Sequence, residues 1–148
     1  MFKNILVPVD GSERSRAAIK KVCSLARADG AHLTFYHARA IFIPNTVVGD
    51  TPVFDVSTID SIRMAAEKHA QTILQAAVAE ATESGVEADS FSDERDRPYQ
   101  GIIEAAESRG CDLIFMASHG RSPAGALFLG SETQSVLAHC KIPVLVYR

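Results

Sequence analysis

Short apolar segments alternate along the chain with longer segments whose apolar residues recur at helical spacing, and this alternation restricts the fold more than any other feature. Strands that alternate with helices form a parallel sheet covered by helices on both faces. We therefore predict an α/β fold in a single domain, residues 1–148, built on a doubly wound five-stranded parallel sheet. The expected strands cover residues 4–9, 32–37, 86–92, 112–117 and 143–147, and the expected helices cover residues 12–29, 57–84, 98–109 and 131–139.

The apolar content of each expected strand predicts its place in the sheet. Residues 4–9 and 112–117 are almost continuously apolar, as is typical of strands that are covered on both faces. Residues 86–92 form the most polar strand, which we expect at an edge. With the first and fourth strands as central neighbours, the predicted strand order is 3-2-1-4-5.

Two connecting segments have no periodic pattern. Residues 39–57 are interrupted by Pro and Gly but carry many apolar side chains, so we predict a lid or a mobile segment that folds over another part of the molecule. Residues 93–97 are all charged and are predicted to form a solvated loop.

Composition and charge exclude several classes of partner. A formal net charge of -3, without a run of Lys and Arg, argues against DNA or RNA as the main partner. No apolar stretch approaches the roughly 18–20 residues of a membrane-spanning helix, and the first residues lack a signal-peptide pattern. Cys23, Cys111 and Cys140 are widely spaced, which fits reduced thiols better than disulfides. We expect a cytoplasmic protein with no membrane partner.

The last expected strand, Pro143 to Tyr147, is followed by nothing that would cover its edge. An open strand edge favours pairing with an identical copy. We therefore predict a homodimer through this strand.

The predicted topology also indicates where a ligand binds. In doubly wound sheets, ligands bind beyond the carboxyl ends of the strands, where the strand order reverses. Asp10 follows the first strand and Ala117 ends the fourth, so we expect them to face each other across that crevice. Residues 116–133 begin there and reach Gly-Ser at an expected helix start, where N–H groups and a hydroxyl can hold a phosphate. The GxGxxG fingerprint and the GxxxxGK[ST] phosphate loop are both absent.

The sequence resembles the universal stress protein family from end to end. Residues 5–12, Ile-Leu-Val-Pro-Val-Asp-Gly-Ser, resemble the family's first strand and turn. Residues 118–121, 129–131 and 143–146 resemble its C-terminal half. This resemblance implies the fold predicted above and is strongest to the branch of the family that binds ATP.

That branch has a motif of Gly, two residues, Gly, nine residues, Gly, and then Ser or Thr. The same spacing here falls on Ala117, Gly120, Gly130 and Ser131, so the first Gly is replaced by Ala. The added methyl costs little at ordinary backbone dihedrals and much at positive φ. Glu132 stands where the family usually has an apolar residue, and it is expected to compete with a triphosphate unless it binds Mg²⁺ or faces solvent.

The resemblance implies ATP and Mg²⁺ as cofactors and assigns the contacts. The Asp10 side chain is expected at the ribose, and the backbone of residues 8–9 and near Ala38 at the adenine. Gly120, Gly130, Ser131 and the amides that follow are expected at the phosphates, where Ser131 adds a hydroxyl. The candidate contact residues are Pro8, Val9, Asp10, Ala38, Met116, Ala117, His119, Gly120, Arg121, Gly130, Ser131, Glu132 and Thr133.

No residue stands out as a catalytic group, and the acidic and His residues show no metal-ligand spacing. His119 receives no proton-transfer role, and His37 and His69 are interpreted as packing residues. We therefore predict a nucleotide-responsive stress or signalling module with at most weak ATPase activity. Two alternatives remain open: an interaction protein of the same fold that has lost nucleotide binding, and an enzyme that acts on ATP or other adenylates. Asp10 has an alternative role as a turn residue that helps to cap the first helix.

Overall fold

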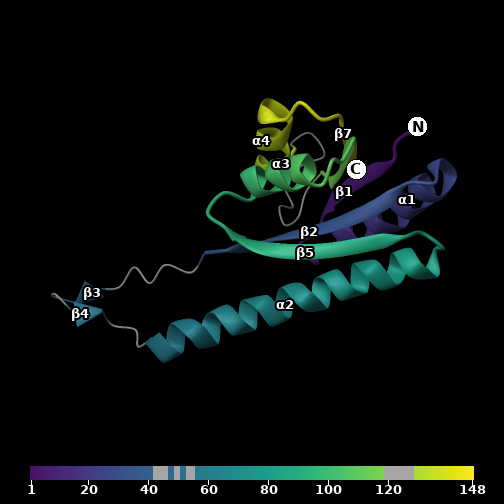
Figure 1. Cartoon of the computed structure of the whole chain (residues 1–148). Coiled ribbons are helices and arrows are strands. Elements are labelled where there is room, and N and C mark those ends of the chain that lie inside the picture. Colours follow the sequence, from purple (N-terminus) through teal and green to yellow (C-terminus); the bar gives the residue numbers. More distant parts are fainter. Residues whose placement is uncertain (42–46, 49–50, 53–55, 119–128) are drawn as a thin grey trace.

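The structure, a computed structural model, describes residues 1–41, 47–48, 51–52, 56–118 and 129–148. One five-stranded sheet has the order β5-β2-β1-β6-β7, and every neighbouring pair in it is parallel (Figure 1). This is the predicted order 3-2-1-4-5, with the first and fourth strands as neighbours and the polar third strand at an edge. The strands are β1 (Asn4–Pro8), β2 (His32–Ala40), β5 (Ala88–Arg95), β6 (Leu113–Ala117) and β7 (Val144–Tyr147).

Helices cover both faces of this sheet. Side chains alternate along β1, so Ile5 and Val7 face one layer and Leu6 faces the other. The first layer contains α1 (Glu13–Asp29) and α2 (Val56–Glu83), and the second contains α3 (Pro98–Ser108) and α4 (Ser131–His139). A separate antiparallel pair, β3 (Val47–Val48) with β4 (Thr51–Pro52), lies on the connection from β2 to α2. No helix in the described ranges is both long enough and apolar enough to span a bilayer.

The ends of α1 follow the sequence signals. The Ser12 side chain caps the helix by accepting a hydrogen bond of 3.1 Å from the backbone N–H of Ser15. Gly30 ends the helix at a φ of 64°, a left-handed conformation that favours glycine. These two residues therefore determine where α1, the helix that connects β1 to β2, begins and ends.

Two predictions about the connections are wrong in part. The second strand continues beyond His37 to Ala40, and the predicted charged loop begins late because Asp93 to Arg95 belong to β5. The two extensions pair with each other, Ala38 beside Asp93 and Ala40 beside Arg95, so backbone hydrogen bonds extend the ladder. The predicted lid over residues 39–57 lies largely outside the described residues. The structure does not describe residues 42–46, 49–50 and 53–55, and it describes only the backbone of residues 47–48 and 51–52.

Candidate functional site

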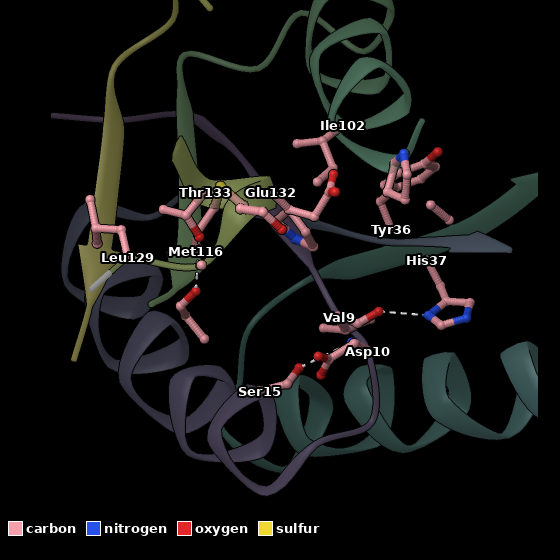
Figure 2. Close-up of a pocket in the computed structure, with 16 residues that line it drawn as sticks. Val9, Asp10, Ser15, Tyr36, His37, Ile102, Met116, Leu129, Glu132 and Thr133 are labelled. Carbon is pink, nitrogen blue, oxygen red and sulfur yellow. Dashed lines mark hydrogen bonds between the residues drawn. The ribbon is translucent and has the colours of Figure 1, made fainter. Parts of the chain in front are cut away.

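A pocket of about 650 Å³ opens at the carboxyl ends of β1, β2 and β6, beside the first turn of α4 (Figure 2). This is the place where the strand order reverses, between β1 and β6. Its described lining residues are Pro8, Val9, Asp10, Ser15, Tyr36, His37, Ala38, Pro98, Ile102, Met116, Ala117, Leu129, Gly130, Ser131, Glu132 and Thr133.

Every predicted contact residue that the structure describes lines this pocket. Three further predicted contacts, His119, Gly120 and Arg121, lie outside the described residues. The predicted contacts that the structure does describe come from three strands, or the residues just after them, and from the start of one helix. These segments lie far apart in the sequence, and only the fold brings them together. The contact residues are Pro8, Val9, Asp10, Ala38, Met116, Ala117, Gly130, Ser131, Glu132 and Thr133.

Asp10 has a structural role as well as a place at the pocket. Its Oδ1 accepts a hydrogen bond of 2.9 Å from the backbone N–H of Ser12, and its own N–H donates to Ser15 Oγ at 3.4 Å. These bonds fix the carboxylate at the start of α1 (Figure 2). Within the part of the chain that the structure describes, Oδ2 accepts no hydrogen bond, so Asp10 can both shape the turn and offer an oxygen to a ligand.

His37 is at the pocket wall and is not simply a packing residue. Its Nδ1 lies 2.7 Å from the carbonyl oxygen of Val9 (Figure 2). A carbonyl only accepts, so Nδ1 carries a proton and donates this bond. The N–H of Val9 donates to the Tyr36 carbonyl at 2.8 Å, so both backbone polar groups of Val9 are already bonded. Val9 therefore meets a ligand chiefly through packing.

Within the described residues, the backbone donors at the start of α4, beside the pocket, have no partner. The first bond within this helix runs from the N–H of Gln134 to the carbonyl of Gly130, and the N–H of Gly130 donates to Ser118. The amides of Ser131, Glu132 and Thr133 precede that first bond, and they lie where the helix dipole is positive. Such a helix start is suited to bind an anion.

Ala117, which replaces the first glycine of the motif, adopts an ordinary strand conformation. No non-glycine residue in the described ranges has positive φ, and Ala117 ends β6 in register with Tyr147. Its methyl group therefore adds no backbone strain.

One wall of the pocket is held by a polar cluster that sequence analysis missed. The hydroxyl of Tyr36, which is only 1% exposed, donates to Asp93 Oδ1 at 2.6 Å. Arg95 donates to Asp93 Oδ2 at 3.0 Å from Nε and 2.7 Å from Nη2, and it also bonds Glu104 on α3. Burial and the neighbouring Asp93 carboxylate both raise the pKa of Tyr36, so this phenol stays protonated and donating.

Six lining residues were not predicted from the sequence. Tyr36 and His37 precede the predicted contact Ala38, and Leu129 precedes Gly130, so proximity to predicted contacts was the available signal. Nothing in the local pattern distinguished Ser15, Pro98 and Ile102. They line the pocket because α1 and α3 pack on the sheet. The six are Ser15, Tyr36, His37, Pro98, Ile102 and Leu129.

Comparison with known proteins agrees with this architecture over the whole chain. The model of the universal stress protein family matches residues 1–148. A universal stress protein of Thermus aquaticus is 32% identical over 148 residues, and YxiE of Bacillus subtilis is 31% identical over 150 residues. In both comparisons the match covers 100% of this chain and 100% of the relative.

Solved structures show the same fold. A universal stress protein from Lactobacillus plantarum superposes with a TM-score of 0.80 at 24% identity, covering 99% of this chain and 97% of that one. A protein from Archaeoglobus fulgidus in complex with dAMP gives 0.65 at 20% identity, covering 99% and 98%. One from Arabidopsis thaliana with AMP bound gives 0.68 at 13% identity, covering 97% and 90%. By the match to the family model and to its full-length relatives, this chain belongs to the universal stress protein family.

Proposed function

We propose that this protein binds an adenine nucleotide, ATP with Mg²⁺, in the pocket between β1 and β6 and acts as a nucleotide-responsive stress or signalling module. The observation that carries the proposal is the start of α4, where the amides of residues 131–133 have no partner among the described residues and belong to residues that line a pocket together with Asp10. Family members with dAMP and AMP bound support the adenine nucleotide as the ligand class.

The shape of the pocket suggests how the parts of a nucleotide are distributed. The amides at the start of α4 suit the phosphates, because they carry the positive end of the helix dipole. Asp10 suits a ribose hydroxyl, since its Oδ2 is a charged acceptor at the pocket wall. The apolar wall formed by Val9, Ile102 and Met116 then remains for the base.

The residues present fit a magnesium ion that arrives with the nucleotide. Glu132 Oε2 is buried and has no hydrogen-bond partner in the described structure, and it lines the phosphate side of the pocket. No cluster of three or more His, Cys, Asp or Glu residues able to hold a metal is found among the described residues. Mg²⁺ is commonly held by one or two carboxylates together with substrate phosphates and water, and it neutralises phosphate charge. Glu132 would supply such an oxygen, while Asp10 Oδ2 is left for the ribose.

Asp10→Asn is expected to weaken AMP binding about tenfold or more, because a charge-assisted hydrogen bond to the ribose is lost while the amide oxygen can still accept from Ser12. Isothermal titration calorimetry measures the change. Asp112→Asn is the matched control, since the Asp112 carboxylate accepts from the backbone N–H groups of Lys3 and Asn4 at the other end of β1. Its affinity for AMP is expected to stay within about twofold of the unaltered protein.

The same titrations distinguish the competing functions. An unaltered protein that binds neither AMP nor ATP with Mg²⁺ would refute nucleotide binding and favour an interaction protein of this fold. ATP turnover that is fast and is lost in Asp10→Asn would indicate an enzyme. Turnover that is equally slow in both proteins supports a binding module, which is what we propose.

We also propose a homodimer in the cytoplasm, formed through the open edge of β7. The carbonyls of Pro143 and Tyr147 accept from β6, so the alternate residue Val146 directs its N–H away from β6. Leu145 is 38% exposed on this terminal strand of the sheet. Cys23, Cys111 and Cys140 are free thiols, which fits a reducing compartment.

Val146→Pro is expected to convert the dimer to a monomer. Proline removes an outward N–H without removing a bond of the β6–β7 ladder, so the fold should persist. Size-exclusion chromatography with light scattering measures the mass, and far-ultraviolet circular dichroism checks the fold. A monomeric unaltered protein, or a folded variant that still dimerises, would show that β7 is not the interface.

A further inference from the structure

The described lining of the pocket is unusual in its charge for a site that is to receive phosphates. It contains two carboxylates, Asp10 and Glu132, and no Lys or Arg among the residues that the structure describes. Among the described residues, the positive potential there comes from backbone amides at the start of α4 and not from side chains. A ligand with high negative charge therefore meets repulsion as well as attraction.

Glu132 brings a negative charge to the same place as the positive backbone amides of α4. It belongs to the first turn of α4, next to Ser131, and lines the pocket (Figure 2). Its Oε2 is buried and accepts no hydrogen bond within the described structure. A buried carboxylate oxygen without a partner is costly, and a cation or a donor placed beside it relieves that cost. Asp10, by contrast, already has Oδ1 bonded to Ser12.

We infer that Glu132 makes the binding of ATP depend on Mg²⁺, whereas the binding of AMP does not depend on the metal. This inference rests on the proposed nucleotide site and specifies which charge state of the nucleotide that site accepts. Metal-free ATP carries about twice the negative charge of AMP or of its own Mg²⁺ complex, and like charges a few ångströms apart repel strongly in a partly desolvated site. Mg²⁺ removes that excess charge and satisfies the carboxylate oxygen.

The test is a set of calorimetric titrations with AMP and ATP, each with Mg²⁺ and with EDTA at equal ionic strength. The unaltered protein should bind ATP at least about tenfold more tightly with Mg²⁺ than without it, while its affinity for AMP changes less than about threefold. In Glu132→Gln, which keeps the size of the side chain and removes its charge, metal-free ATP should bind about tenfold more tightly than it does to the unaltered protein.

Glu13→Gln is the matched control, because Glu13 is exposed in the first turn of α1 and does not line this pocket. It should keep the full metal dependence of the unaltered protein. If AMP binds and Glu132→Gln shows the same dependence on Mg²⁺ as the unaltered protein, the inference is wrong although the nucleotide site stands. If neither nucleotide binds under any condition, the proposed function itself fails and this inference with it. Thermal unfolding of both variants checks that they fold.

Discussion

Gly101→Ala should lower the free energy of unfolding by about 2–3 kcal/mol, as overpacking of a tight interior does. A Cβ atom at position 101 would lie 2.1 Å from the hydroxyl oxygen of Tyr36 and 2.8 Å from Cγ of Arg95. Tyr36 cannot easily retreat, because it is 1% exposed and its hydroxyl is bonded to Asp93. Chemical denaturation followed by circular dichroism measures the loss.

The sign of this effect is informative, since alanine is a better helix former than glycine by up to about 1 kcal/mol. Without a clash, Gly101→Ala in α3 would therefore stabilise the protein. Gln100→Ala, at the exposed neighbouring position, is the control and should change stability by less than about 0.5 kcal/mol.

A Tyr36→Phe background removes the closest contact of the added methyl group. Gly101→Ala should therefore cost at least about 1 kcal/mol less stability there than in the unaltered protein. Equal costs in both backgrounds would show that the tyrosine hydroxyl is not the obstacle.

Asp93→Asn should destabilise the fold by about 1–2 kcal/mol at neutral pH, since an amide cannot replace the charged acceptor for Arg95. The lower part of the usual range applies because the Asp93 side chain is 35% exposed and partly screened by solvent. The Tyr36 hydroxyl loses its charged acceptor in the same variant. Asp96→Asn, at an exposed position just beyond β5, is the control and should be close to neutral.

The same carboxylate is expected to make the protein sensitive to acid. Partial burial raises the pKa of Asp93, but hydrogen bonds from Arg95 and Tyr36 outweigh this effect, so the pKa in the folded state lies below its usual value. A lowered pKa means that the contribution to stability is present above the unfolded-state pKa of about 3.9 and is lost as the pH falls through the lower folded-state pKa. Denaturation between about pH 2.5 and 6 should therefore show a shallower acid decline for Asp93→Asn than for the unaltered protein. Parallel declines would contradict this role.

The charged residues of β5 illustrate why part of the fold was beyond local sequence reasoning. Five charged residues in succession, 93–97, are typical of a solvated loop, yet the first three form strand. Asp93 is stabilised there by Tyr36, which lies 57 residues earlier in the chain, and by Arg95, two residues later. The strand depends on a partner that only the β2–β5 register brings near.

His37 and Glu132 illustrate the corresponding limit at the site. Glu132 was placed at the crevice from sequence, because strand ends and helix starts converge at the point where the strand order reverses, whereas His37 was interpreted as a packing residue. The bond from His37 to the Val9 carbonyl and the unpartnered oxygen of Glu132 depend on side-chain orientation and burial. No spacing rule encodes those quantities.

By itself, the sequence determined the order of the helices and of the strands of the five-stranded sheet, the topology of that sheet and the location of the pocket. Apolar periodicity, helix caps and the rules for parallel crossovers act over short stretches, so they can be read without coordinates. Only the tertiary structure decided which polar atoms are already bonded and which remain for a ligand. That distinction separates Asp10, held by Ser12, from Glu132, whose buried oxygen has no described partner. The physical reason is that hydrogen-bond satisfaction and desolvation depend on neighbours far apart in the chain, which meet only when the layers pack.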